Sequence, residues 1–101
     1  MRAALFIAGC AAVQGCCDEA ALPRAIDQLA SPRASERNQA LHAVGRCGER
    51  SERAVPLIER LMYDPNVGVA SSAAYALRRI DTPSARQALK AAEARKRDKK
   101  P

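Results

Sequence analysis

The chain has 101 residues and a mass of 10.8 kDa, which is enough for one small domain that buries about two thirds of the surface of its unfolded chain. Hydrophobic residues make up 48 % of the sequence, but only 3 % of residues are aromatic and none is Trp. Ala is the commonest apolar residue, with scattered Leu, Ile and Val. This composition favours close helix–helix contact and argues against a β-sandwich.

The net charge of +6 is concentrated towards the carboxyl end. Six basic and two acidic residues lie between Lys90 and Lys100, so this segment carries four of the six net charges. The remainder of the chain is nearly balanced. We interpret residues 93–101 as a basic, solvated tail, with contact to phosphate or anionic lipid as the alternative.

Three similar segments recur along the chain at offsets of 31 and 33 residues. They are AVQGC at 12–16, AVGRC at 43–47 and ALRRI at 76–80. The last belongs to the stretch 67–83, which predicts an amphipathic helix between an Asp-Pro turn and a Thr-Pro turn. Small residues at equivalent places in each copy would let these helices approach their neighbours closely. These places are Gly9 and Ala12, Ala40 and Ala43, and Ala73 and Ala76.

A further helix is predicted after each of these segments, with apolar residues at helical spacing. The three apolar stripes are Leu22, Ala25, Ile26 and Leu29; Val55, Ile58, Leu61 and Met62; and Ala85, Ala88, Leu89 and Ala92. Pro23 and Pro56 fall near two of the predicted helix starts, where a missing N–H costs little. Asp64-Pro65 and Thr82-Pro83 each predict a side-chain cap followed by a first-turn proline.

Together these residues resemble HEAT repeats of the short kind first described in phycobilin lyases. The matching positions are Leu61, Asp64, Pro65, Val69, Ala73, Ala76, Leu77, Ile80 and Asp81, with Ala40, Ala43, Val44, Gly45, Gly48, Ala54, Val55 and Pro56, and Ala12, Val13, Asp18, Ala21, Leu22 and Pro23 upstream. The resemblance covers about residues 5–92 and departs from the pattern at Glu36, which stands where the next copy has Val69. It implies an all-α fold, an α-solenoid of about 2.5 short helix pairs in a right-handed superhelical stack. It also implies a protein-binding scaffold.

The cysteines and the single histidine do not form a metal-ligand pattern. No C-x-x-C pair exists, and His42 lies five residues from Cys47. In the repeat register Cys16 and Cys47 occupy the position of Ile80, so each is predicted to be a small buried apolar residue. Equivalent positions in stacked repeats lie on the order of 10 Å apart, too far for a disulfide between Cys16 and Cys47. We expect no metal, cofactor or catalytic site.

The first 17 residues support two interpretations. Residues 5–16 follow the repeat at their small and apolar positions, which indicates a half-repeat. The apolar stretch 3–13 instead resembles a secretory signal, and the tripeptides before Cys10 and Cys16 resemble a bacterial lipoprotein processing box, which makes both cysteines candidate lipidation sites. The predicted organisation is therefore residues 1–17 as half-repeat or signal, residues 18–92 as HEAT-like repeats, and residues 93–101 as the basic tail.

A contact surface is predicted along the second helix of each pair, one row outside the core. We call six residues of this row the outer ridge: Asn38, His42, Arg46, Ser71, Tyr75 and Arg79. In the repeat register, His42 stands over Tyr75 and Arg46 over Arg79. Tyr and Arg are frequent anchors at interfaces. This predicts a non-catalytic scaffold or adaptor that binds an unidentified protein.

Two other functions fit the same sequence. A nucleic-acid-binding protein could use Arg37, Arg46, Arg78 and Arg79 beside the basic tail. A small lipid-anchored envelope protein would follow from processing at Cys10 or Cys16. With so few repeats, the apolar amino-terminal face also favours self-association, docking on a larger partner or a place in a longer array. The expected location is the cytoplasm, or the cell envelope if the protein is lipid-anchored.

Overall fold

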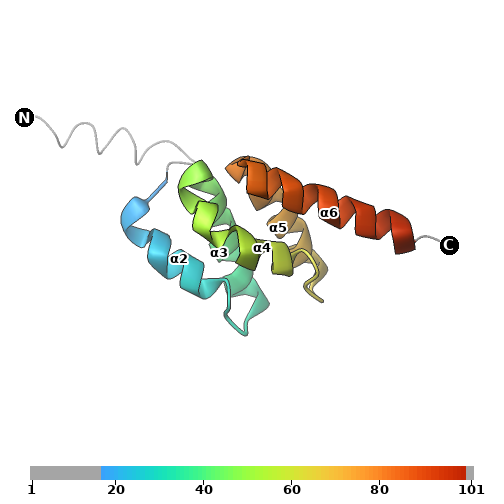
Figure 1. The fold of residues 1–101 in the computed structure, drawn as a ribbon. Coiled ribbons are helices and arrows are strands. Elements are labelled where there is room, and N and C mark those ends of the chain that lie inside the picture. Colours follow the sequence, from blue (N-terminus) through green and yellow to red (C-terminus); the bar gives the residue numbers. More distant parts are fainter. Residues whose placement is uncertain (1–16, 100–101) are drawn as a thin grey trace, which may run out of the picture.

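The structure, a computed structural model, describes residues 17–99, and these residues form a stack of helices (Figure 1). In chain order the elements are η1 (Glu19–Ala21), α2 (Leu22–Gln28), α3 (Ala34–Arg46), η2 (Gly48–Ala54), α4 (Val55–Leu61), α5 (Val67–Ile80) and α6 (Pro83–Lys99), where η marks a 3₁₀ helix. No strand occurs among these residues. The helix pairs predicted from the sequence are present.

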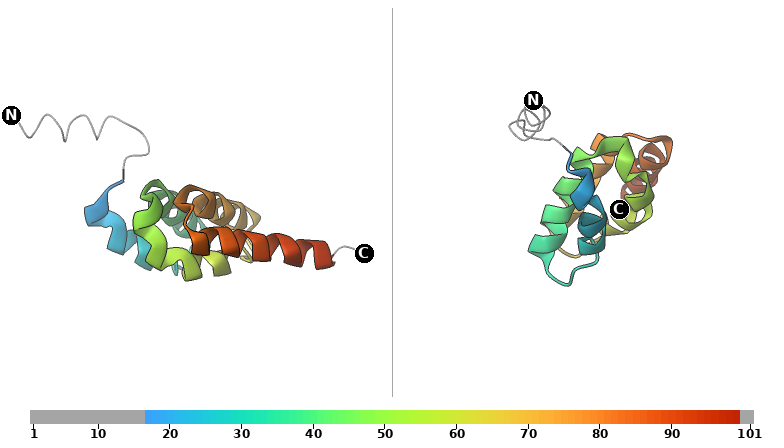
Figure 2. Two further views of the ribbon diagram at one scale, coloured as in Figure 1. Left: turned by 45° about the horizontal axis from the view of Figure 1, so that its top comes forward. Right: turned by 90° about the vertical axis from the view of Figure 1, so that its left-hand side faces the viewer.

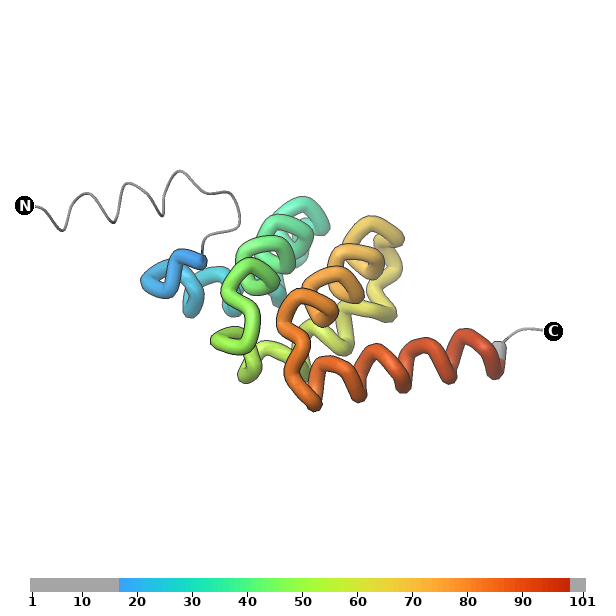
Figure 3. The backbone as a smooth tube through the Cα atoms, turned by 90° about the horizontal axis from the view of Figure 1, so that it is seen from above, coloured from blue at the N-terminus to red at the C-terminus, as the bar shows by residue number. Residues whose placement is uncertain are grey.

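The helices form two rows. α3 and α5 are the second helices of their pairs and lie side by side (Figure 3), and α5 packs against α3 more extensively than any other two helices pack. α2 packs on α3, α4 packs on α5, and α6 contacts both α4 and α5. This arrangement confirms the all-α solenoid.

The core consists of the predicted apolar positions. Leu41, Val44, Ile58 and Leu77 are completely inaccessible to solvent. The stripes on α2, α4 and α6 are buried or half-buried, and Pro23 and Pro56 occupy the first turns of α2 and α4. The small residues also act as predicted: a Cβ placed on Gly45 would lie 3.4 Å from the Ala76 Cα atom. The backbones of α3 and α5 are therefore in close contact.

The ends of α3 and α5 repeat one another. Each helix is followed by a residue with left-handed backbone geometry, Gly48 with a φ of 58° and Asp81 with a φ of 52°. A left-handed residue after the last turn satisfies terminal carbonyl groups, and Asp81 N–H does so by donating to the Leu77 carbonyl. The turn into η2 is fixed further by buried Ser51, whose hydroxyl donates to the Val44 carbonyl at 2.6 Å.

One predicted helix cap is wrong. The side chain that caps α5 belongs to Asn66, whose Oδ1 accepts the Val69 N–H at 3.0 Å. Asp64 instead accepts the Asn66 N–H and the guanidinium of Arg37. Asp64 lies two residues before the N-cap position, so its carboxylate closes the turn before α5 and pairs with a cation of the preceding repeat. The other predicted cap is confirmed, since Thr82 Oγ1 accepts the Ala85 N–H at 3.3 Å.

A part-buried ion pair joins the turns of the two repeats. Arg37 donates from Nε and Nη2 to the Asp64 carboxylate at 3.0 and 3.1 Å, and from Nη1 to the Ser31 carbonyl at 2.9 Å. The two side chains are only 15 % and 7 % exposed. This bidentate contact fixes the spacing between one repeat and the next.

The predicted burial of Cys47 is confirmed, but its bonding partner was not predicted. Cys47 is buried, but it forms a disulfide with Cys17, which precedes α2. The repeat register placed Cys16 opposite Cys47 and assigned no position to Cys17. The chain instead enters α2 through a short 3₁₀ turn, capped by Asp18, and this turn brings Cys17 to the end of α3. The disulfide therefore ties the start of the described chain to the second helix of the first pair.

The predicted basic tail is largely helical. α6 continues as far as Lys99 and projects beyond the other helices (Figure 2). Within residues 17–99, no helix is both long enough and apolar enough to cross a membrane. The predicted half-repeat or signal, including Cys10 and Cys16, lies outside the described residues.

Candidate interaction face

The structure brings five of the six outer-ridge residues to one shallow hollow of about 400 Å³. They come from the exposed sides of α3 and α5, which lie next to each other because Gly45 and Ala76 allow the helices to approach. The five are His42, Arg46, Ser71, Tyr75 and Arg79. The 33-residue register thus predicted correctly that His42 meets Tyr75 across the two repeats.

Tyr75 lies at the centre of this group. Its ring centroid is 6.2 Å from that of His42, with an angle of 52° between the planes. The Arg79 guanidinium carbon lies 5.8 Å from the Tyr75 ring centroid, and Arg79 Nη1 donates to the Tyr75 hydroxyl at 3.4 Å. Tyr75 is nevertheless 44 % exposed. The ring therefore contacts two neighbouring side chains and presents part of its surface to solvent.

Asn38 does not share this position. Its side-chain oxygen accepts a hydrogen bond from Ser72, on the side of α5 that faces α3. Asn38 therefore contributes to the contact between repeats and not to the exposed face. The repeat register placed Asn38 opposite Ser71, which is one residue before its actual partner Ser72. The register gave this error because it does not contain the rotation of one helix against the other.

The outer ridge carries positive charge that is not neutralised locally. Among residues 17–99, no ion pair joins Arg46 or Arg79 to a carboxylate. Arg37, expected in the same basic patch, is instead largely buried in its pair with Asp64. The charge available on this face is therefore smaller than the sequence indicates, and it is gathered around Tyr75.

A second Tyr–Arg pair was not found from the sequence. The Arg95 guanidinium carbon lies 4.6 Å from the ring centroid of Tyr63, which is 45 % exposed. Tyr63 follows α4 and Arg95 lies in the carboxyl half of α6, two segments that the repeat register does not relate. The sequence indicated this pair only through Tyr63, an aromatic residue in a predicted turn.

Residues 17–99 contain no group of three or more His, Cys, Asp or Glu side chains placed to hold a metal ion. The features of this face, which are an ordered aromatic ring, uncompensated guanidinium groups and a shallow open hollow, suit contact with another macromolecule.

The comparison with protein families agrees with this architecture. The family model for HEAT repeats matches residues 22–100. Comparison with curated proteins and with solved structures gave no significant match. The family match does not distinguish the short phycobilin-lyase kind from other HEAT repeats. It spans the helix pairs from α2 to α6, and the chain therefore belongs to the HEAT repeat family.

Proposed function

We propose that this protein is a non-catalytic adaptor that binds a partner protein through the outer ridge. The observation that carries the proposal is the group formed by His42, Tyr75 and Arg79, in which a half-exposed ring has an imidazole and a guanidinium as neighbours. HEAT repeats generally serve as protein-interaction scaffolds, which supports the same assignment.

The order of Tyr75 before binding matters for affinity. A side chain that is already restrained loses less conformational entropy when a partner covers it. Arg46 and Arg79 line the same hollow as the ring, and within residues 17–99 neither is paired with a carboxylate. A complementary surface would therefore place an apolar or aromatic group on Tyr75 and carboxylates beside the two guanidinium groups.

The test is affinity capture with the double variant Tyr75→Ala/Arg79→Ala. We expect unchanged helicity by circular dichroism, because both side chains are exposed, and loss of the proteins that the wild-type chain retains. Arg24→Ala/Arg60→Ala provides a control, since it removes two exposed side chains of α2 and α4 that lie outside the outer ridge. Undiminished capture by the Tyr75 variant, or equal loss with the control, contradicts the proposal.

The disulfide supports a second assignment, a lipid-anchored protein of the cell envelope. Disulfides such as Cys17–Cys47 persist in oxidising compartments and are rare in the cytoplasm of mesophiles. The same location is required if the processing box before Cys10 is used. This assignment concerns where the adaptor acts and leaves the outer ridge as its binding face.

Mass spectrometry of the protein from its native host tests this location. Lipid on an amino-terminal cysteine, with Cys17 and Cys47 resistant to alkylation until reduced, is the expected result. An intact Met1 together with alkylation of both cysteines without reductant would place the protein in a reducing compartment.

A further inference from the structure

The carboxyl-terminal end of the stack exposes a helix face that is covered in the first repeat. α5 packs on the side of α3 that carries Asn38, Leu41 and Gly45. A shift of 33 residues places the equivalent positions of α5 at Ser71, Ala74 and Arg78. Ser71 and Arg78 are exposed and Ala74 is half-buried, because no further helix stacks on this side among the described residues.

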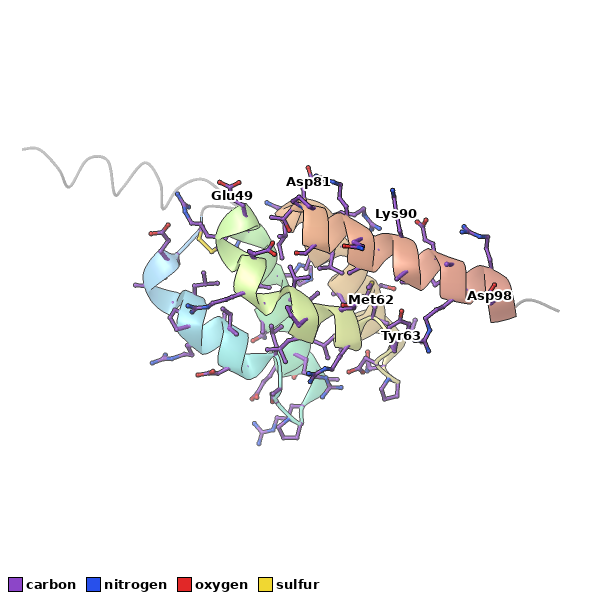
Figure 4. All side chains as sticks on the ribbon, in the orientation of Figure 1. Glu49, Met62, Tyr63, Asp81, Lys90 and Asp98 are labelled. Carbon is purple, nitrogen blue, oxygen red and sulfur yellow. A yellow bond between two sulfur atoms is a disulfide. The ribbon has the colours of Figure 1, made fainter. Side chains whose placement is uncertain are left out.

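This face forms one wall of a groove of about 490 Å³, and α6 forms the other. Figure 3 shows that the backbones of α5 and α6 diverge from their junction. Figure 4 shows Met62 and Tyr63, at the end of α4, lying near α6. The apolar part of the lining consists of Met62, Ala70, Ala74, Leu89 and Ala92. Val67, 78 % exposed, also lines the groove.

Basic side chains line the same groove. Arg78 comes from α5, and Arg95 and Lys96 come from the overhanging part of α6. Two carboxylates are also present: Asp64 is already paired with Arg37, which leaves Glu93 against the three cations. Arg95 is held over the Tyr63 ring. An apolar floor therefore lies within a rim of net positive charge.

Another HEAT helix is a poor occupant of this groove. Close contact between α3 and α5 depends on Gly45, because a Cβ added to this residue would lie only 3.4 Å from the Ala76 Cα atom. The equivalent residue of α5 is Arg78, whose side chain would hold a further helix away.

We propose that this groove binds an acidic amphipathic helix of a partner protein. Its apolar face would cover the groove lining, with carboxylates beside Arg78 and Lys96. From Val67 to Arg78 is twelve residues of α5, or about 17 Å at 1.5 Å per residue, so about three turns of bound helix would fill the groove. Recognition would follow the helix-in-groove mode, with apolar anchors at positions i, i+3 or i+4, and i+7.

A set of three synthetic peptides of about 14 residues tests the proposal. The first has Leu at i, i+4, i+7 and i+11 and Glu on its other face. The second replaces each Glu with Lys, and the third keeps the composition of the first but scatters the Leu positions. Each carries a fluorophore, and binding to the full chain is followed by anisotropy. We expect saturable binding of the first peptide, and at least about tenfold weaker binding of the other two.

Three single variants locate the binding. Arg78→Glu and Lys96→Glu should each weaken the acidic peptide by about tenfold, because each places a like charge at the rim. Arg24→Glu makes the same change on α2, at the far end of the stack, and should leave binding within about twofold. All three side chains are exposed, and circular dichroism checks that each variant is folded. Tyr75→Ala/Arg79→Ala should also retain the peptide, which separates this groove from the outer ridge.

Several results would overturn the proposal. One is equal binding of the basic or the scattered peptide, and another is an equal effect of Arg24→Glu. A third is competition by DNA. If a 16-base-pair duplex binds more tightly than the acidic peptide, displaces it and is weakened equally by Arg78→Glu, the groove would be assigned to nucleic acid. A dimer in sedimentation that Arg78→Glu dissociates would assign it to a second copy of the chain.

Discussion

The helices α3 and α5 are built on the same pattern but have different surroundings, and their differences show what each surrounding requires. Equivalent core positions are buried in both: Ala40 and Ala73, Val44 and Leu77. Four departures lie near the ends of the two helices. They are Cys47 in place of Ile80, Gly45 in place of Arg78, Arg33 in place of Asn66 and Glu36 in place of Val69.

Each departure corresponds to a different local contact. Cys47 is bonded to Cys17, whereas Ile80 is buried as a side chain of the core. Gly45 meets a neighbouring helix, whereas Arg78 faces an open groove. The repeat thus specifies the helix pair, and the residues that break the repeat specify what lies beside it. Exchanging residues between the two helices tests this distinction.

The disulfide should give the largest effect. Replacing Cys17 with Ser and Cys47 with Ala removes a crosslink between residues 30 apart in sequence. On the chain-entropy estimate this lowers the free energy of unfolding by about 3–4 kcal/mol. Urea denaturation with and without reductant measures the loss, which should equal the effect of reductant on the wild type. A variant as stable as the oxidised wild type would show that α2 is held by packing alone.

Placing the α5 residue in α3 should have a slightly smaller effect. Gly45→Arg puts a long side chain where an added Cβ already lies 3.4 Å from the Ala76 backbone, so we expect a loss of about 3 kcal/mol from overpacking. Gly45→Ala is the matched control. Its Cβ makes close but tolerable contacts, and Ala is favoured over Gly within a helix by about 1 kcal/mol, so its stability should not fall.

Equal urea midpoints for Gly45→Arg and the wild type would show that α3 and α5 are not in close contact. The reverse exchange, Arg78→Gly, should cost only about the 1 kcal/mol of helix propensity, because Arg78 faces the groove.

A second exchange between the two helices concerns their caps. Asn66 caps α5 through its side chain, whereas Arg33 at the same position of α3 makes no such bond. Asn66→Arg should therefore lower the free energy of unfolding by about 1 kcal/mol. In a separate variant, Arg33→Asn should raise it by part of that amount, because it adds a cap to α3. The gain is smaller than the loss because Arg33→Asn also removes the ion pair of Arg33 with Glu36 at 3.1 Å. Thermal unfolding of the two single variants measures both signs, and a gain from Asn66→Arg would contradict the assigned cap.

The sequence predicted the helix pairs, the core stripes and the meeting of His42 with Tyr75, because all of these depend only on the repeat. It did not predict the partners of Cys47, Asp64 or Asn38. These depend on how the chain enters α2 and on how far one helix rotates against its neighbour, which a register does not contain. Glu36 illustrates the limit. As a core position it looked like a defect, but the structure shows it bonded to Ser31 and Arg33 within its own turn.

The smallest expected effect is a dependence of stability on pH. A hydrogen bond from Ser31, reinforced by Arg33, lowers the pKa of Glu36, and hydrogen bonds from Ser84 and then Thr82 lower the pKa of Glu52. A carboxyl group whose pKa is lower in the folded state stabilises the fold above its unfolded pKa, which is near 4.5. That contribution is lost as the pH falls through the folded pKa.

The urea midpoint of the wild type should therefore decrease on acidification below about pH 5. In Glu36→Gln/Glu52→Gln the dependence should be weaker over the same range. Both groups are solvent-exposed, so the difference should be smaller than those above. The single variants Glu36→Gln and Glu52→Gln show how much of the pH dependence each group contributes. Glu36 joins the first turn of α3 to the residues before it, whereas Glu52 joins η2 to the start of α6 through Ser84 at 2.5 Å. Parallel pH profiles for wild type and double variant would show that neither contact persists in solution.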